Sequence, residues 1–128
     1  MRLPRPYKEM RRVIRINRKE VEITRPSYKR DSRGGRTEGV PETHTGLLWV
    51  FEPNEETAPT EFGVRQDGDL HALGIPPEYE SSGTPELDIS FNDVIEHNGN
   101  EYTVETVDSL PTQEDAQYVV IYFDKKTN

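Results

Sequence analysis

The dipeptide Asn98-Gly99 lies between two stretches in which apolar and polar residues alternate, residues 88–97 and residues 100–108. The tightest hairpin turn requires a positive φ at both of its central residues, which asparagine tolerates and glycine adopts freely. An Asn-Gly pair between alternating stretches is therefore the strongest short-range signal of a β-hairpin. It predicts two antiparallel strands joined by a two-residue turn.

The second of these stretches has the two-residue period of a half-buried strand. Tyr102 and Val104 fall on one face, and the polar residues around them fall on the other. Val107 has the opposite parity, which predicts a bulge or a change of face near Thr106.

A third strand is expected at residues 118–123, which are apolar at every position and rich in β-branched and aromatic side chains. The run is too short for an ordinary helix, and its lack of alternation indicates a strand covered on both sides or lying in a barrel wall. A loop over residues 109–116 joins it to the preceding strand. The last third of the chain is therefore predicted to be a three-stranded antiparallel meander.

Shorter signals upstream predict further strands. Residues 21–24 alternate, and the apolar residues 47–51 contain the only tryptophan. Residues 61–66 and 70–75 are expected to form a hairpin around Asp67-Gly68. Six or seven short strands with hardly any helix are typical of a small β-barrel or sandwich. We expect an all-β fold, a small antiparallel barrel with a long early loop and a basic N-terminal arm.

At 128 residues the chain is expected to form one domain. We place a basic N-terminal arm at residues 1–20 and the barrel at residues 21–128. For the arm, a short helix with five residues on one stripe is one alternative, and a strand over residues 13–16 is the other. We favour an arm that is mobile or ordered by a partner. The helical stripe would consist of Tyr7, Met10, Val13, Ile14 and Asn17.

Charge is divided unevenly along the chain. Residues 1–40 carry 13 of the 16 lysines and arginines but 5 of the 24 acidic residues, a net charge of +8. Residues 41–128 carry a net charge of −16. Such a division predicts two electrostatic faces, with the basic one offered to nucleic acid or to an acidic neighbour. A basic segment that only solubilises the chain is the alternative.

Residues 27–46 form the longest stretch without a predicted element. A compact domain rarely keeps a loop of about 20 residues without a use for it, so such loops are usually functional or disordered. This one combines glycines with a run of basic residues, and we expect it to be a working loop. The basic residues are Lys29, Arg30, Arg33 and Arg36.

The sequence shows no catalytic or metal-binding pattern. The chain has no cysteine, which excludes disulfides and cysteine-based zinc sites. His44, His71 and His97 lack metal-ligand spacing and are expected at the surface or on edge strands. Asp67-Gly68-Asp69 lacks the remaining ligands of a calcium loop and indicates a turn. We expect no enzymatic activity, no cofactor and no metal.

Membrane and secretion signals are also missing from the sequence. No apolar run approaches the roughly 20 residues of a membrane span, and the first residues lack the apolar stretch of a secretory signal. We expect a soluble protein that works or assembles inside a cell and has no membrane partner.

Residues 91–107 and the apolar run that follows resemble the head-closure proteins of tailed viruses, also called stopper or head-completion proteins. The shared pattern is an aspartate before two apolar residues, a turn with glycine, an aromatic residue two positions before a valine, and a final apolar strand. The resemblance extends over roughly residues 20–124. The matching residues are Asp93, Val94, Ile95, Gly99, Tyr102, Val104 and residues 118–123.

The resemblance implies a β-barrel that forms a homo-oligomeric ring below the portal and its adaptor. Such a ring closes the capsid after DNA packaging and offers an attachment surface to the tail or a tail-completion protein. It implies a place in the neck of the virion, assembled in the host cytoplasm. In that family a long early loop reaches into the channel and helps to hold packaged double-stranded DNA. By position this loop is residues 27–46, with Lys29, Arg30, Arg33 and Arg36 as the DNA contacts.

The basic arm is not part of the family pattern. We expect it to dock on the adaptor above the ring, because its charge suits an acidic neighbour. The expected docking residues are Arg5, Tyr7, Arg11, Arg12 and Arg15.

Two other functions stay open. Tail-completion and other neck proteins share much of the pattern. A monomeric nucleic-acid-binding barrel of the OB or SH3-like kind would place stacking aromatic residues and basic residues on one exposed strand face. The aromatic-rich strands here carry Glu101, Glu105 and Asp124 instead, which argues against that alternative.

Overall fold

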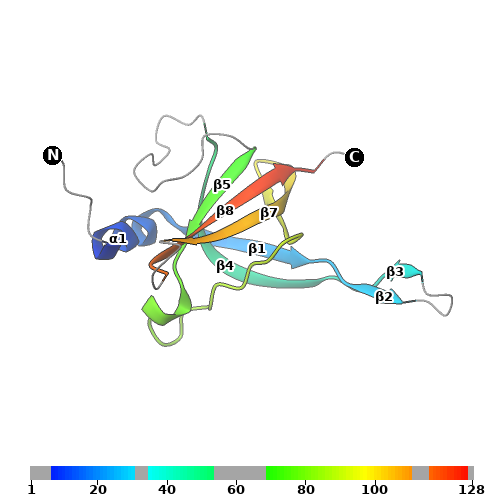
Figure 1. The fold of residues 1–128 in the computed structure, drawn as a ribbon, viewed down its shortest axis with the longest axis horizontal. Coiled ribbons are helices and arrows are strands. Elements are labelled where there is room, and N and C mark those ends of the chain that lie inside the picture. The colour runs from blue at the N-terminus through cyan, green and yellow to red at the C-terminus, as the bar shows by residue number, and fades with distance from the viewer. Residues whose placement is uncertain (1–6, 31–34, 54–68, 111–115, 127–128) are drawn as a thin grey trace.

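The computed structural model describes residues 7–30, 35–53, 69–110 and 116–126. Six strands form a closed antiparallel barrel in the order β1-β4-β5-β8-β7-β6 (Figure 1). The prediction of a small all-β barrel is therefore confirmed. The barrel strands are β1 (Lys19–Arg25), β4 (Glu42–Phe51), β5 (Leu70–Gly74), β6 (Val94–His97), β7 (Asn100–Leu110) and β8 (Tyr118–Lys125).

The predicted meander is present as β6, β7 and β8. Asn98 and Gly99 have φ angles of 52° and 82°, and they join the two strands across the pair His97 and Asn100. The predicted bulge is also present, because the register between β7 and β8 shifts between Val104 and Thr106. Beyond the bulge Val107 pairs with Ile121 of the interior core and Leu110 packs against the outer core, so the parity of the inward residues changes there.

The barrel wall around β8 is covered by apolar side chains on both of its faces. The odd-numbered residues of β8 face the barrel interior, and its even-numbered residues face an outer layer. This explains why Tyr118 to Phe123 are all buried, as the sequence predicted. The interior core contains Ile23, Leu48, Leu70, Ala72, Ile95, Tyr102, Val104, Val119, Ile121 and Phe123. The outer core contains Met10, Ile14, Phe51, Leu73, Ile75, Tyr118, Val120 and Tyr122.

The outer layer is supplied by a helix, α1 (Tyr7–Asn17), which packs at one end of the barrel (Figure 1). Met10 and Ile14 lie on the predicted stripe and are 5% and 0% exposed. Of the two alternatives for this segment the helix is correct, and the preference for a mobile or partner-ordered arm is wrong for residues 7–17. The reason is that the apolar stripe is buried against β4, β5 and β8 of the same chain.

The stretch 27–46 is not structureless, and that expectation is wrong. β1 and β4 pair along seven residues, from Lys19 with Leu48 to Arg25 with Glu42. Beyond them the chain continues as a second hairpin of β2 (Tyr28–Arg30) and β3 (Arg36–Glu38). The β2–β3 hairpin projects from the barrel (Figure 1), and from here on we call residues 26–30 and 35–41 the arm, as distinct from the N-terminal segment.

β5 confirms the strand predicted at residues 70–75. Its neighbours are β4 and β8. The predicted partner at residues 61–66 and the turn at Asp67-Gly68 lie outside the described residues. A short 3-10 helix, η1 (Pro77–Tyr79), follows β5. No helix within the described ranges has the length and apolar character needed to cross a membrane.

Alanine substitutions at two isoleucines of α1, two residues apart, test how much the helix contributes to stability. Ile14→Ala should lower the free energy of unfolding by about 2–5 kcal/mol, because Ile14 is fully buried between helix and barrel. Ile16→Ala is the control, since Ile16 is 70% exposed, and it should change stability by less than about 0.5 kcal/mol. Urea unfolding measures both. Equal, small losses would show that the helix is not part of the core.

Candidate functional site

Three of the four predicted DNA-contact residues lie in the outer part of the arm. Lys29 and Arg30 belong to β2, and Arg36 belongs to β3. Arg33 lies in the stretch between these strands, outside the described residues. The fold therefore brings three of the four predicted residues together on one small hairpin, away from the barrel (Figure 1).

The pairing of this hairpin brings two arginines into opposition. The register places Arg30 directly opposite Arg36, and Lys29 opposite Thr37. The register thus concentrates two basic positions at one place on this hairpin.

The arm departs from the barrel at Arg25, the last residue of β1. Its guanidinium donates from Nε to Oδ1 of Asp93 over 3.0 Å and from Nη2 to Oδ2 of the same carboxylate over 2.9 Å. It also donates to both oxygens of Asp88, over 3.2 Å from Nη1 and 2.9 Å from Nη2. Two two-point contacts of this kind fix both the position and the plane of the guanidinium group.

The turn before β6 positions the carboxylate of Asp93 for its contact with Arg25. Asp93 is 1% exposed, and its Oδ2 also accepts a hydrogen bond from the backbone N–H of Ser90 over 2.8 Å. The backbone of this turn is also bonded to β7, because the backbone N–H of Val104 donates to the carbonyl oxygen of Asp93 over 2.8 Å. His44 of β4 contacts the carbonyl oxygen of Asp88. We call Arg25, Asp88, Ser90 and Asp93 the clasp.

The sequence reasoning did not find the clasp. Asp93 is named from the sequence among the residues of the family resemblance. Arg25 is included only in the count of basic residues in residues 1–40. The one local signal is an arginine at the end of a strand and directly before Pro26, where the sheet ladder must stop. Its partners lie more than 60 residues away, so no local pattern connects them.

The charges of the clasp stabilise one another. Hydrogen bonds to Asp93 and then to Asp88 raise the pKa of Arg25 above its usual range. The hydrogen bond from Arg25 lowers the pKa of Asp88 below its usual value of 3.8. Both shifts favour the charged forms, so Arg25 and Asp88 are an ion pair over the whole neutral range.

Removing the charge of Asp93 should weaken the barrel. In Asp93→Asn one oxygen that accepts from Arg25 or Ser90 is replaced by a donor group, and we expect a loss of about 1–3 kcal/mol in unfolding free energy. Asp124→Asn removes a charge from an exposed position and is the matched control. Urea unfolding of both variants is the measurement. A loss no larger than that of the control would contradict the role given to the clasp.

The Asp88 contact should depend on pH. Because the folded pKa lies below the unfolded value of 3.8, the stabilisation is complete above pH 3.8 and is lost as the pH falls through the folded pKa. Asp88→Asn should therefore be less stable than the parent at neutral pH, and this difference should vanish in strong acid. The difference should be small, because the Asp88 side chain is 60% exposed and its charge is screened. A difference in unfolding free energy that is independent of pH would contradict the assignment.

Two of the five residues predicted to dock a partner make contacts within the chain. The Arg11 guanidinium lies 3.9 Å from the ring centre of Tyr79 and donates to Gln117. Arg15 donates to the backbone carbonyl oxygen of Tyr79. These contacts tie α1 to η1 and to the start of β8.

Of the other docking residues, Arg5 lies outside the described residues. Tyr7 is 39% exposed, with its ring centre 6.4 Å from that of Tyr118. Arg12 is exposed on the outer face of α1. Lys8 and Ile16 are also exposed and lie four residues before and after it, so they share its face. The helix therefore presents an outer face of Lys8, Arg12 and Ile16. Of these three, only Arg12 is predicted from the sequence as a docking residue.

One histidine differs from expectation. His71 is 0% exposed, although a surface or edge position was predicted. It lies on β5, which is covered on both faces, and its ring meets those of Phe51 and Tyr122 edge-on at 5.7 Å and 5.0 Å between centres. His44 and His97 are half-buried. Within the part of the chain that the structure describes, no three His, Asp or Glu side chains are grouped so as to hold a metal ion.

No family model matches the chain, and a search of curated proteins found no significant match. The function must therefore be argued from the fold, the arm, the clasp and the charge distribution.

Proposed function

We propose that this chain is a structural protein of the neck of a tailed virus, a head-closure subunit. In this role several copies form a ring below the portal and its adaptor, close the capsid after DNA packaging, and present a surface to the tail. The chain acts by binding and positioning, without catalysis and without a cofactor.

The observation that carries the proposal is the basic hairpin held away from a closed barrel. A ring subunit that retains DNA needs a rigid body for contacts with its neighbours and a projecting element that reaches the channel. The barrel fits the first requirement, and the arm, fixed at its base by the clasp, fits the second. Arg30 opposite Arg36 gives the tip a charge that suits phosphate.

The charge of the remaining chain supports the same role. Residues 41–128 carry a net charge of −16, and five of the six barrel strands come from this part of the chain. An acidic wall repels DNA, so contact is confined to the arm. DNA is then held at defined points and slides past the rest of the channel.

A monomeric nucleic-acid-binding barrel is the alternative from a different class. Such barrels stack bases on aromatic residues of an exposed strand face. Among the aromatic side chains that the structure describes, the exposed ones are Tyr7 on α1 and Phe91 in a loop. The barrel surface therefore favours a structural role.

Mass in solution separates these functions. The neck protein should form a ring with itself or on a portal or adaptor protein, and analytical ultracentrifugation of the chain alone and with such a partner measures this. A chain that stays monomeric with every such partner and that retards double-stranded DNA on its own is a nucleic-acid-binding barrel, and the proposal fails.

The arm should retain DNA. The triple change Arg30→Ser, Arg33→Ser and Arg36→Ser should leave folding and particle assembly intact but let packaged DNA leak, because the phosphate contacts are lost. DNA per particle after storage, measured by quantitative amplification, is the readout. Particles that keep their DNA would show that the arm does not hold it.

The matched control removes basic charge from the helix. Lys8→Ser with Arg12→Ser removes two charges from the outer face of α1 and leaves the arm unchanged. We expect this variant to retain DNA in assembled particles but to bind the adaptor more weakly. Equal leakage from both variants would mean that net charge, and not the arm, is responsible.

A further inference from the structure

The barrel has a weak seam between its first and last strands in sheet order. β1 and β6 meet through one residue pair, Thr24 with Val94. By contrast β1 pairs with β4 over seven residues, and β6 pairs with β7 over four. Along the rest of the seam, Lys19 to Ile23 and Ile95 to His97 therefore have a strand partner on one side within the described part of the chain.

The side chains explain why the seam does not close further. If the antiparallel register of Thr24 and Val94 continued, Ile23 would face Ile95, then Glu22 would face Glu96. Ile23 and Ile95 are buried in the interior core and suit such a pair. Glu22 and Glu96 are both exposed, and two like charges directly opposite one another destabilise a strand pair. The seam opens at this step.

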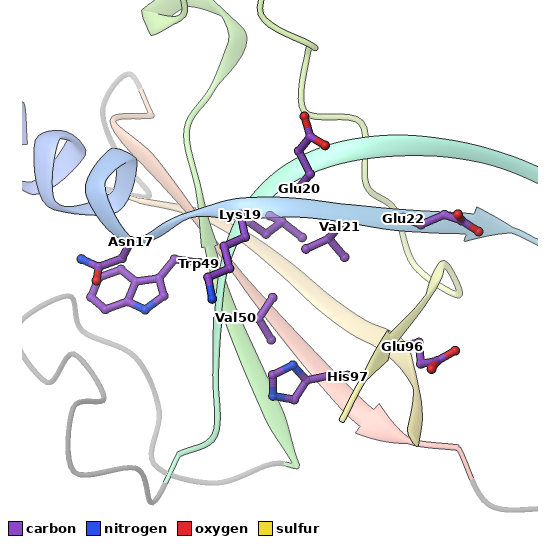
Figure 2. A pocket seen from close by; sticks show the side chains of 10 residues that line it. Asn17, Lys19, Glu20, Val21, Glu22, Trp49, Val50, Glu96 and His97 are labelled. Carbon is purple, nitrogen blue, oxygen red and sulfur yellow. The ribbon is translucent and has the colours of Figure 1, made fainter. Parts of the chain in front are cut away.

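Where the seam opens, the surface is hollowed (Figure 2). The hollow has a volume of about 490 Å³ and lies between β1, β4 and β6. Val21, Leu48 and Val50 give it an apolar wall, with Trp49 at one end and His97 at the other. Three glutamates also line the hollow, together with one lysine, Lys19. The glutamates are Glu20, Glu22 and Glu96.

We propose that this seam binds an extended peptide segment of a partner, in which basic and apolar residues alternate. The segment adds to the free edge of β1 at Lys19 to Glu22 as a further strand. Alternate side chains of a strand point to opposite faces. Those on the inner side meet Val21 and Val50, which suits apolar residues, and those on the outer side lie near Glu22 and Glu96, which suits lysine or arginine.

The charge of the site selects this occupant. An acidic segment would bring a further negative charge between two glutamates that already repel each other, whereas a basic side chain there pairs with both. Main-chain hydrogen bonds to the edge of β1 supply affinity that is independent of sequence, and the alternation supplies specificity. The inference does not rest on the proposed neck function.

The chain provides its own probe for the test. Trp49 is the only tryptophan and lines the hollow, so its fluorescence reports on the seam. The ligand to add is a capped peptide of sequence Val-Lys-Val-Lys-Val-Lys, with Val-Glu-Val-Glu-Val-Glu as its control. We expect a saturable change in fluorescence with the lysine peptide, weakened by salt, and none with the glutamate peptide. No response to the lysine peptide, or an equal response to both, overturns the proposal.

Two variants tie that response to the seam. Glu22→Gln with Glu96→Gln should weaken binding of the lysine peptide by about 3- to 20-fold, because two cross-strand charge pairs are lost. Glu96→Lys should abolish binding and raise the unfolding midpoint, because the introduced ammonium group would pair with Glu22 and close the seam. Glu105→Lys makes the same charge change at an exposed position of β7, outside the seam, and is the control.

The outcomes separate the possible occupants. Circular dichroism first confirms that each variant is folded. If Glu96→Lys binds the peptide as well as Glu105→Lys does, the seam is not the site and the proposal is overturned. If the parent chain self-associates in sedimentation and Glu96→Lys alone makes it monomeric, a second copy occupies the seam, and the assignment to a basic partner peptide is overturned as well.

Discussion

The ion pair between Arg25 and the buried carboxylate of Asp93 is the contact on which the rest of this structure depends. A closed barrel needs its first and last strands in sheet order to meet, and here they do so through one residue pair. Arg25 and Asp93 are the residues next to that pair, so their two hydrogen bonds close the barrel at its weakest point. A buried carboxylate without this partner would be costly, so the contact stabilises the turn before β6 in its observed form.

The same contact sets the direction of the arm. Arg25 is the last residue of β1, and Pro26 interrupts the strand directly after it. Beyond that point the arm has its own short ladder and no apolar core in the described sequence. Its orientation relative to the barrel is therefore inherited from the clasp. Structure and proposed function meet here, since an element that contacts DNA in a channel must be held at a defined angle.

Local sequence signals predicted the barrel well and the arm poorly. The turn at Asn98-Gly99, the bulge near Thr106 and the doubly covered strand at residues 118–123 each have a cause within a few residues, namely positive φ, a break in parity and a continuous apolar run. The sequences of β2 and β3 are Tyr28-Lys29-Arg30 and Arg36-Thr37-Glu38, which contain no alternating apolar residues. These strands therefore carry no hydrophobic period that a sequence could reveal.

Long-range contacts account for the other differences. The clasp joins residues more than 60 positions apart, and the burial of His71 follows from coverage of both faces of β5, which no single strand encodes. The helical stripe at Tyr7 to Asn17 is visible in the sequence, but whether it is buried against this chain or against a partner depends on the outer face of the barrel. The charge of this segment predicts a docking surface, but Arg11 and Arg15 contact Gln117 and Tyr79 of the same chain, which lie far away in the sequence.

The most direct test of this account is the orientation of the arm with and without the clasp. The chain has no cysteine, so Thr37→Cys on β3 and Asp124→Cys on β8 provide two unique sites for spin labels, and double electron–electron resonance gives the distribution of distances between them. With Arg25 intact we predict one narrow distribution, and with Arg25→Met a broad one in a chain that is still folded. A distribution that stays equally narrow in Arg25→Met would contradict the central role of this ion pair.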